Sequence, residues 1–239
     1  MSHISEIAPD VYRISVLVPN LNLQFNHFLV KDEEPLLFHT GLNRMFGELY
    51  EAVARILRPG DLRWIGFSHF ESDECGALNK WLEAAPRARP VCNFLGAVLS
   101  ITDFAIREPH VLEEDSVLQT GNRRFRFCST AHVPHGWDAG VLFEETSRTL
   151  FCSDLFFHPG DVEPLTQSDI VGRSRQALIE MQNSPFAYSV PYTPQTDAVF
   201  DRLAGLQPTT LATMHGSSYR GDGARALRDL SEVVREVMR

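Results

Sequence analysis

Residues 68–76, with the sequence SHFESDECG, contain the densest group of potential metal ligands in the chain. An apolar run at 62–67 precedes them and predicts a buried strand, and the pattern at 74–82 predicts a helix. Side chains alternate along an extended backbone, so His69 and Glu71 are expected to point to the same side. The ligand candidates of this segment are His69, Glu71, Asp73 and Glu74. We therefore expect the segment to line a pocket at the end of a sheet.

Asp73 and Glu74 begin the predicted helix, where acidic side chains commonly cap free N–H groups and complement the helix dipole. Taken alone, the two residues favour this capping role over metal binding. Three later segments favour metal binding instead, because each places a His or an Asp directly after a predicted strand, where open sheets carry ligand sites. These segments are residues 130–138 (TAHVPHGWD), 152–154 (CSD) and 213–217 (TMHGS).

The spacing of the candidates selects one residue from each later segment. Sixty residues separate Glu74 from His135, eighteen separate His135 from Asp154, and sixty separate Asp154 from His215. His132 competes with His135 for one ligand position, but His135 has the better spacing to Asp154 and is followed by Gly-Trp-Asp. We therefore expect His132 to lie beside the ligands or to have a structural role.

The rest of the chain alternates between strand and helix patterns. Strands are expected at 11–18, 23–30, 35–39, 124–129 and 210–214, and a hairpin is expected to join 141–143 to 149–153. Helices are expected at 46–57, 174–182, 195–206 and 224–238. This alternation predicts a single α/β domain over residues 1–239.

The composition excludes several classes of protein. Hydrophobic residues make up 44% of the 239 residues and charged residues 22%, which excludes a disordered chain. The 22 Lys and Arg against 31 Asp and Glu give a net charge of −9, so nucleic acid is not expected as a partner. No apolar stretch reaches the roughly 20 residues of a membrane-spanning helix, and the first residues lack a secretory signal. The four cysteines form no C-x-x-C pair, so we expect reduced thiols in a cytoplasmic protein.

The order and spacing of the ligand candidates resemble the metal-binding signature of the flavodiiron proteins, which have the metallo-β-lactamase fold. That signature runs His-x-Glu-x-Asp-His, then His, Asp and His. The segments LFHTG at 37–41, PYTP at 191–194 and MHG at 214–216 are also similar to segments of that family. The resemblance covers nearly the whole chain. It implies an αββα sandwich of two mixed sheets flanked by helices.

The resemblance also implies a set of ligands for each of two iron ions. One iron would be held by His69, Glu71, His135 and Asp154. The other would be held by Asp73, Asp154 and His215, with Asp154 bridging the two ions. Two positions depart from the family pattern. Glu74 stands where the family normally has His, and it either binds the second metal or only caps the helix. His39 stands where the family normally has Asp.

Four further residues are expected near the metals without binding them, namely His39, His132, His158 and Tyr188. His158 and Tyr188 could donate a hydrogen bond to bound oxygen, although core packing explains Tyr188 equally well. The sequence to residue 239 contains no flavodoxin-like segment, so we expect no bound flavin. In this respect the chain resembles the stand-alone oxygen-binding di-iron proteins. We expect either an external electron donor or a signalling partner, and a homodimer by analogy with relatives.

The oxygen-rich ligand set bears on the choice of metal. Zinc hydrolases of this fold have His where this chain has Glu71, and four carboxylates balance the charge of two divalent ions. Such mixed ligation favours iron or manganese over a zinc hydrolase site. We therefore expect two iron ions, with zinc or manganese possible in the purified protein. The expected function is binding or reduction of O2, with NO as a related substrate. The alternatives are a metal-dependent hydrolase and a non-enzymatic oxygen sensor.

Overall fold

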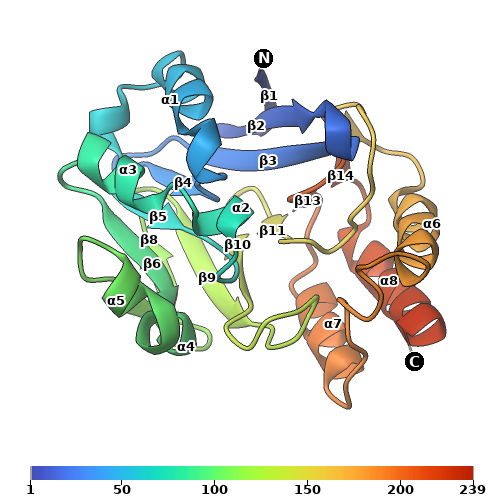
Figure 1. Ribbon diagram of the computed structural model, residues 1–239. Helices are drawn as coiled ribbons and strands as arrows, with labels where there is room; N and C mark the ends of the chain where they lie inside the picture. The colour runs from blue at the N-terminus through green and yellow to red at the C-terminus, as the bar shows by residue number, and fades with distance from the viewer. Residues whose placement is uncertain (1, 239) are drawn as a thin grey trace.

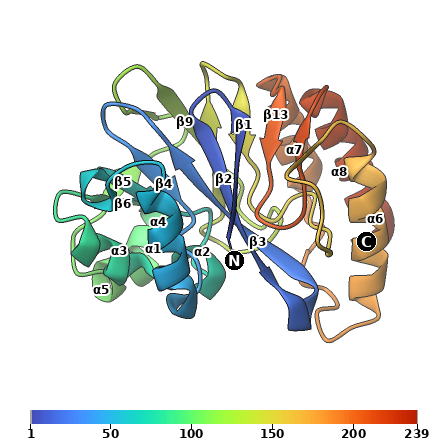
Figure 2. The same cartoon turned by 90° about the horizontal axis from the view of Figure 1, so that it is seen from above.

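Two seven-stranded sheets pack face to face in the computed structural model, which describes residues 2–238. Helices cover the outer face of each sheet, so the molecule has four layers in the order αββα (Figures 1 and 2). Each sheet mixes parallel and antiparallel strand pairs. The predicted fold class is therefore confirmed.

The first sheet is built by the N-terminal half of the chain. Its strands, in spatial order, are β1 (His3–Ala8), β2 (Val11–Val18), β3 (Leu23–Val30), β4 (Leu36–Phe38), β5 (Trp64–Gly66), β6 (Arg89–Asn93) and β7 (His110–Leu112). The strands from β1 to β4 pair antiparallel, and those from β4 to β7 pair parallel. The expected strands at 35–39 and 62–67 thus become neighbours, with Leu37 opposite Ile65.

The second sheet is built by the C-terminal half. Its strands, in spatial order, are β12 (Leu165–Thr166), β14 (Ser218–Arg220), β13 (Thr210–Ala212), β11 (Thr149–Phe151), β10 (Gly140–Glu144), β9 (Arg124–Ser129) and β8 (Val117–Gln119). The expected hairpin is confirmed as β10 and β11, with Leu142 opposite Phe151. β11 and β13 pair in parallel, which brings the ends of these two strands together at one edge.

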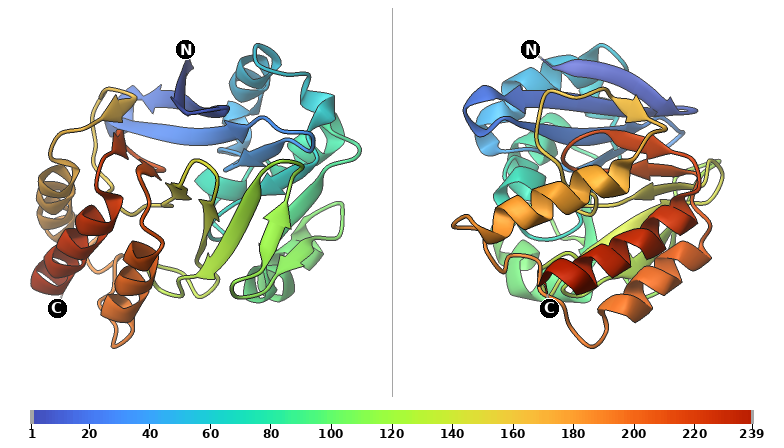
Figure 3. Two further views of the ribbon diagram at one scale, coloured as in Figure 1. Left: turned by 180° about the vertical axis from the view of Figure 1, so that it is seen from behind. Right: turned by 90° about the vertical axis from the view of Figure 1, so that its right-hand side faces the viewer.

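Helical segments connect the strands of each half. Those of the first half are η1 (Pro19–Leu21), η2 (Asn43–Met45), α1 (Phe46–Ala54), η3 (Pro59–Asp61), α2 (Ser72–Cys75), α3 (Leu78–Ala84), α4 (Phe94–Gly96), η4 (Ala97–Ile101) and α5 (Thr102–Phe104). Those of the second half are α6 (Ile170–Gln182), α7 (Thr196–Gly205) and α8 (Gly223–Met238), which lie together over the second sheet (Figure 3). No helix of residues 2–238 is long and apolar enough to cross a membrane.

Four phenylalanine rings pack together in the apolar core between the two sheets, beside aliphatic side chains. The ring centroid of Phe151 lies 5.5 Å from that of Phe28, 5.3 Å from that of Phe38 and 6.2 Å from that of Phe125. All four side chains are at most 1% exposed. Such large, tightly packed rings contribute much of the burial energy of a core. They fix how the ends of the two sheets lie against each other.

The expected single helix at 74–82 is wrong, because the chain forms two helices, α2 and α3, separated at Gly76 and Ala77. The backbone N–H of Ala77 donates to the carbonyl of Gly41 at 2.9 Å instead of continuing the ladder of α2. The hydroxyl of Thr40 accepts from the same N–H at 3.2 Å. These long-range contacts end α2 after one turn and hold that turn against the end of β4.

Candidate metal centre

The segments with ligand candidates converge where strands of the two sheets end. Residues 68–76 follow β5 of the first sheet, while 152–154 and 213–217 follow β11 and β13 of the second. Two backbone hydrogen bonds join the segments after β5 and β13 to strands of the opposite sheet. The N–H of Gly140 donates to the carbonyl of Ser68 at 2.9 Å, and that of Asn26 donates to the carbonyl of Met214 at 2.9 Å.

Four of the expected ligands form one cluster, comprising His69, Glu71, His135 and Asp154. One ligand atom from each side chain lies within 4.8 Å of the others. His69 Nε2 lies 2.9 Å from Glu71 Oε2 and 3.0 Å from His135 Nε2. Asp154 Oδ2 lies 3.4 Å from His135 Nε2 and 3.7 Å from His69 Nε2. Glu71 and His135 are partly exposed, so this cluster is open to solvent on one side.

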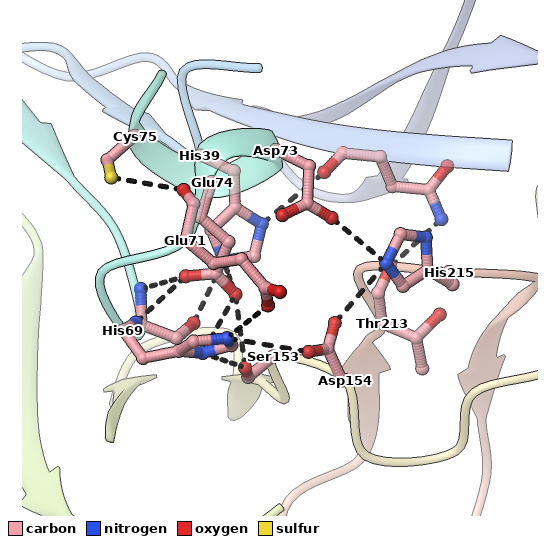
Figure 4. A network of polar contacts seen from close by, with 12 residues as sticks. His39, His69, Glu71, Asp73, Glu74, Cys75, Ser153, Asp154, Thr213 and His215 are labelled. Carbon is pink, nitrogen blue, oxygen red and sulfur yellow. Dashed lines mark hydrogen bonds and ion pairs between the residues drawn. The ribbon is translucent and has the colours of Figure 1, made fainter. Parts of the chain in front are cut away.

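A second group lies on the other side of Asp154. His215 Nε2 is 3.3 Å from Asp73 Oδ2 and 3.4 Å from Asp154 Oδ1. The other ring nitrogen, Nδ1, lies 2.9 Å from the carbonyl of Gln24, which orients the ring and turns Nε2 toward the carboxylates. The two oxygens of Asp154 therefore face different groups of side chains, as Figure 4 shows.

One candidate ligand atom in this region is buried without a hydrogen-bond partner. Within residues 2–238, Asp154 Oδ1 is such an atom, although His215 Nε2 lies 3.4 Å from it. Buried unpaired polar atoms are costly and call for an explanation such as an ion. Ligand atoms that share an ion at about 2.1 Å lie roughly 3–4 Å from one another, which matches the distances in both groups. The donors of His69, Glu71, His135 and Asp154 therefore fit a divalent metal ion, and Asp73 and His215 add the same kinds of donor atom on the other side of Asp154.

The carboxylates make this region strongly attractive to cations. Burial alone would lower the pKa of His69, but Glu74, Glu71 and Asp154 outweigh it and raise that pKa to about 10. Burial likewise opposes protonation of His215, and Asp73 and Asp154 raise its pKa above the ordinary value. In the opposite direction, His135 and His69 hold the pKa of Glu71 well below its usual range. A bound metal ion would take the place of these protons.

Glu74 lies behind His69 and has its own set of partners. Its Oε2 accepts hydrogen bonds from the backbone N–H groups of Ser68 and His69, at 2.6 and 2.9 Å. Its Oε1 accepts from the hydroxyl of Ser153 at 3.1 Å and lies 3.4 Å from His69 Nδ1. The side chain is fully buried. These contacts place the carboxylate on the far side of the His69 ring, and metal binding by Glu74 stays a prediction.

The two positions that depart from the family pattern contact each other. His39 Nε2 lies 3.5 Å from Glu74 Oε1 and 2.9 Å from the hydroxyl of Ser68. His39 is completely buried, and burial holds its pKa well below the ordinary value. Sequence reasoning named His39 and Glu74 separately and missed their pairing. It also missed Ser68 and Ser153, although each directly precedes a ligand candidate, and that position is the one available signal.

The remaining candidates lie outside the two groups of ligand atoms. His158 is buried, its Nδ1 lies 2.9 Å from the carbonyl of Phe156, and its Nε2 accepts from the N–H of Ser217 at 2.9 Å. Both ring nitrogens thus bind backbone and hold the loop that carries His215. His132 contributes through its backbone, because its N–H donates to the carbonyl of Gly136 at 2.7 Å and closes the turn around His135. Tyr188 is 83% exposed.

Comparison with known proteins places the chain in a family. The model of the ODP family beta lactamases matches residues 23–216. The chain is 22% identical to the flavo-diiron protein FprA2 of Clostridium acetobutylicum, over 96% of the chain and 62% of that protein. It is 27% identical to the rubredoxin-oxygen oxidoreductase of Megalodesulfovibrio gigas, over 82% of the chain and 49% of that protein. The chain thus spans between about half and three fifths of the length of these relatives.

Solved structures show the same fold. The structure of rubredoxin oxygen:oxidoreductase from Desulfovibrio gigas superimposes with a TM-score of 0.82 at 22% identity, covering 96% of this chain and 61% of that one. A fragment of a putative diflavin flavoprotein from a Nostoc species superimposes with a TM-score of 0.78 at 14% identity, covering 98% and 97%. The chain therefore belongs to the ODP family, with distant homology over nearly its whole length to the metallo-β-lactamase-like di-iron domain of the flavodiiron proteins.

Proposed function

We propose that this chain is a non-haem di-iron protein that binds or reduces O2, with NO as a related substrate. The observation that carries the proposal is the position of Asp154, whose two oxygens face two separate groups of His and carboxylate ligands. Membership of the ODP family supports the same function. The oxygen-rich ligand set supports iron, or manganese, over the zinc of a hydrolase.

The proposed ligand set has six residues, which are His69, Glu71 and His135 for one iron, Asp73 and His215 for the other, and Asp154 for both. Glu74 is proposed to act through His69 rather than as a seventh ligand, because its oxygens already accept three hydrogen bonds. Acceptors behind a ligand histidine fix its ring and raise its basicity.

Iron bound at this centre would supply the electrons and open binding positions for O2 or NO. The chain's own residues hold and shield the ligands. The carbonyl of Gln24 orients His215, and the rings of Phe25 and Phe157 pack edge-on against His215 at 5.0 and 5.5 Å. Ser153 donates to Glu74 and directly precedes the bridging Asp154. This packing holds the His215 ring in place, while Glu71 and His135 on the other side are partly exposed.

Sustained reduction of O2 requires electrons from elsewhere. One relative is named a rubredoxin-oxygen oxidoreductase, which supports an external electron carrier as the partner of this chain. We propose that the chain itself binds no flavin and either receives electrons from such a carrier or acts as an oxygen sensor with a signalling partner.

The central test of function is the response of the iron-loaded protein to air. Protein loaded anaerobically with Fe²⁺ is expected to change its visible absorption on addition of O2 and to take up O2 in an electrode chamber. With excess chemical reductant, continued uptake identifies a reductase, and uptake that stops after one equivalent identifies a sensor. Zinc-loaded protein is the control and should take up none. Ester or lactone hydrolysis by zinc-loaded protein, without O2 uptake by the iron form, would establish the hydrolase instead.

Replacement of the bridging carboxylate tests the ligand assignment. We expect Asp154→Ala to lose both metal ions or to bind both much more weakly, because the carboxylate serves both groups of ligands. Elemental analysis of protein loaded with two equivalents of metal measures this directly. Asp201→Ala is a matched control, since Asp201 is an exposed residue of α7 and belongs to neither ligand group. Two fully occupied sites in Asp154→Ala would refute the bridge.

Exchange of the acid and the imidazole behind His69 tests the role of Glu74. We expect Glu74→His and His39→Asp each to weaken Co²⁺ binding by about 10- to 100-fold, because each leaves two like groups facing each other. The double variant His39→Asp/Glu74→His restores a carboxylate opposite an imidazole and should recover most of the affinity. Titration followed by Co²⁺ absorption measures all three. Tighter binding with a changed spectrum in Glu74→His alone would instead identify residue 74 as a ligand position.

A homodimer is also proposed, with a second copy covering the exposed side of the centre. Large apolar side chains beside the ligand segments support it, since Trp137 is 64% exposed and Phe94 is 63% exposed. Exposed aromatic groups of this kind are common at protein interfaces. Light scattering should give the mass of two chains over a wide range of concentration, and a constant mass of one chain would refute the dimer.

A further inference from the structure

A large cavity opens directly onto the proposed metal centre. Its volume is about 560 Å³. At one end it is lined by proposed metal ligands, including Glu71, Asp73 and Asp154. Its other walls come from α6, α8 and the loops before β3 and after β11. The ligand side chains therefore face a space that extends well beyond the ions.

The walls of this cavity are apolar away from the centre. They include Leu178 and Met181 from α6, Leu230 and Val234 from α8, and Phe156. Leu178, Leu230 and Val234 are at most 4% exposed, so these walls are part of the packed core of the second half. Apart from the proposed ligands, the described lining contains no charged side chain. A molecule in this space would thus meet hydrocarbon along its length and cations at one end.

The size of the cavity exceeds what a diatomic molecule requires. A water molecule takes about 30 Å³ of liquid, and O2 or NO needs a comparable space. Cavities of roughly 300–1,000 Å³ hold organic ligands of some size. An apolar space of this kind gains free energy when hydrocarbon fills it, at up to about a fourfold increase in affinity for each methylene.

We propose that this cavity is a binding site for a carboxylate with an aliphatic chain, whose carboxylate lies at the metal centre and whose chain lies along the apolar walls that α6 and α8 help to form. The proposal rests on the proposed metal centre for the head group only. The chain lies against the more accessible apolar lining, which includes Met181, Phe186 and Val190 and binds hydrocarbon with or without metal. Met181 is suited to chains of different shape, because methionine is flexible and polarizable.

The test is calorimetric titration with straight-chain carboxylates from butanoate to decanoate, using zinc-loaded and metal-free protein. Zinc keeps the measurement free of redox chemistry. We expect affinity to rise by up to about fourfold for each methylene and then to level off when the cavity is full. The matching primary alcohols should show the same rise with length but weaker binding to the zinc-loaded protein. Metal-free protein should keep the dependence on length and lose the preference for carboxylate.

Variants that fill the cavity locate the chain. Leu178→Trp should lower decanoate affinity at least tenfold and leave butanoate affinity nearly unchanged. Met181→Trp, at a partly exposed position, is a second variant that places less strain on the core. Leu57→Trp, on the opposite helical layer and also partly buried, is the matched control and should behave as the unmodified protein.

The outcomes separate this proposal from the proposed function. Equal affinity for butanoate and decanoate, or an unchanged gain with length in both cavity variants, overturns the cavity site and leaves the metal centre intact. Protein that binds no metal by elemental analysis, yet shows the length dependence, overturns the metal centre and retains the apolar site.

Discussion

The carboxylate of Asp154 is the constraint on which the rest of the centre depends. Its two oxygens face different groups of proposed ligands, so the position of Asp154 sets the distance and orientation between the two groups. The backbone around it is tied to the loop that carries His215, because the N–H of Met214 donates to the carbonyl of Ser153 at 2.8 Å. The parallel pairing of β11 with β13 makes this bond possible. A shift of either strand would move both ligand groups.

The αββα architecture brings together the proposed ligands from both halves of the chain. His69, Glu71 and Asp73 follow a strand of the first sheet, and Asp154 and His215 follow strands of the second. The aromatic core between the sheets holds their ends in register, as the packing of Phe151 against rings of both sheets shows. Ligands on rigid strand ends can be placed more accurately than ligands on long loops.

The buried pair formed by His39 and Glu74 shows how polar groups are satisfied beside the centre. A buried carboxylate is costly unless it is hydrogen-bonded, and Glu74 accepts from two backbone N–H groups and from Ser153. The neighbouring imidazole of His39 completes the set. The two residues that depart from the signature implied by the resemblance are therefore in contact with each other. The same network reaches Nδ1 of His69, one of the proposed metal ligands, because Glu74 Oε1 lies 3.4 Å from that atom.

Apolar periodicity in the sequence predicted an α/β domain and the hairpin of β10 and β11, because such periodicity is a local pattern. The αββα sandwich and the grouping of His69, Glu71, His135 and Asp154 were implied by the resemblance to the flavodiiron proteins. The sequence did not predict the division of the helix at 74–82, since that division depends on contacts with Thr40 and Gly41 more than thirty residues away. The pairing of His39 with Glu74 and the apolar cavity lined by α6 and α8 were likewise decided only by the tertiary structure. Each arises from side chains distant in sequence, and periodicity cannot show which such side chains meet.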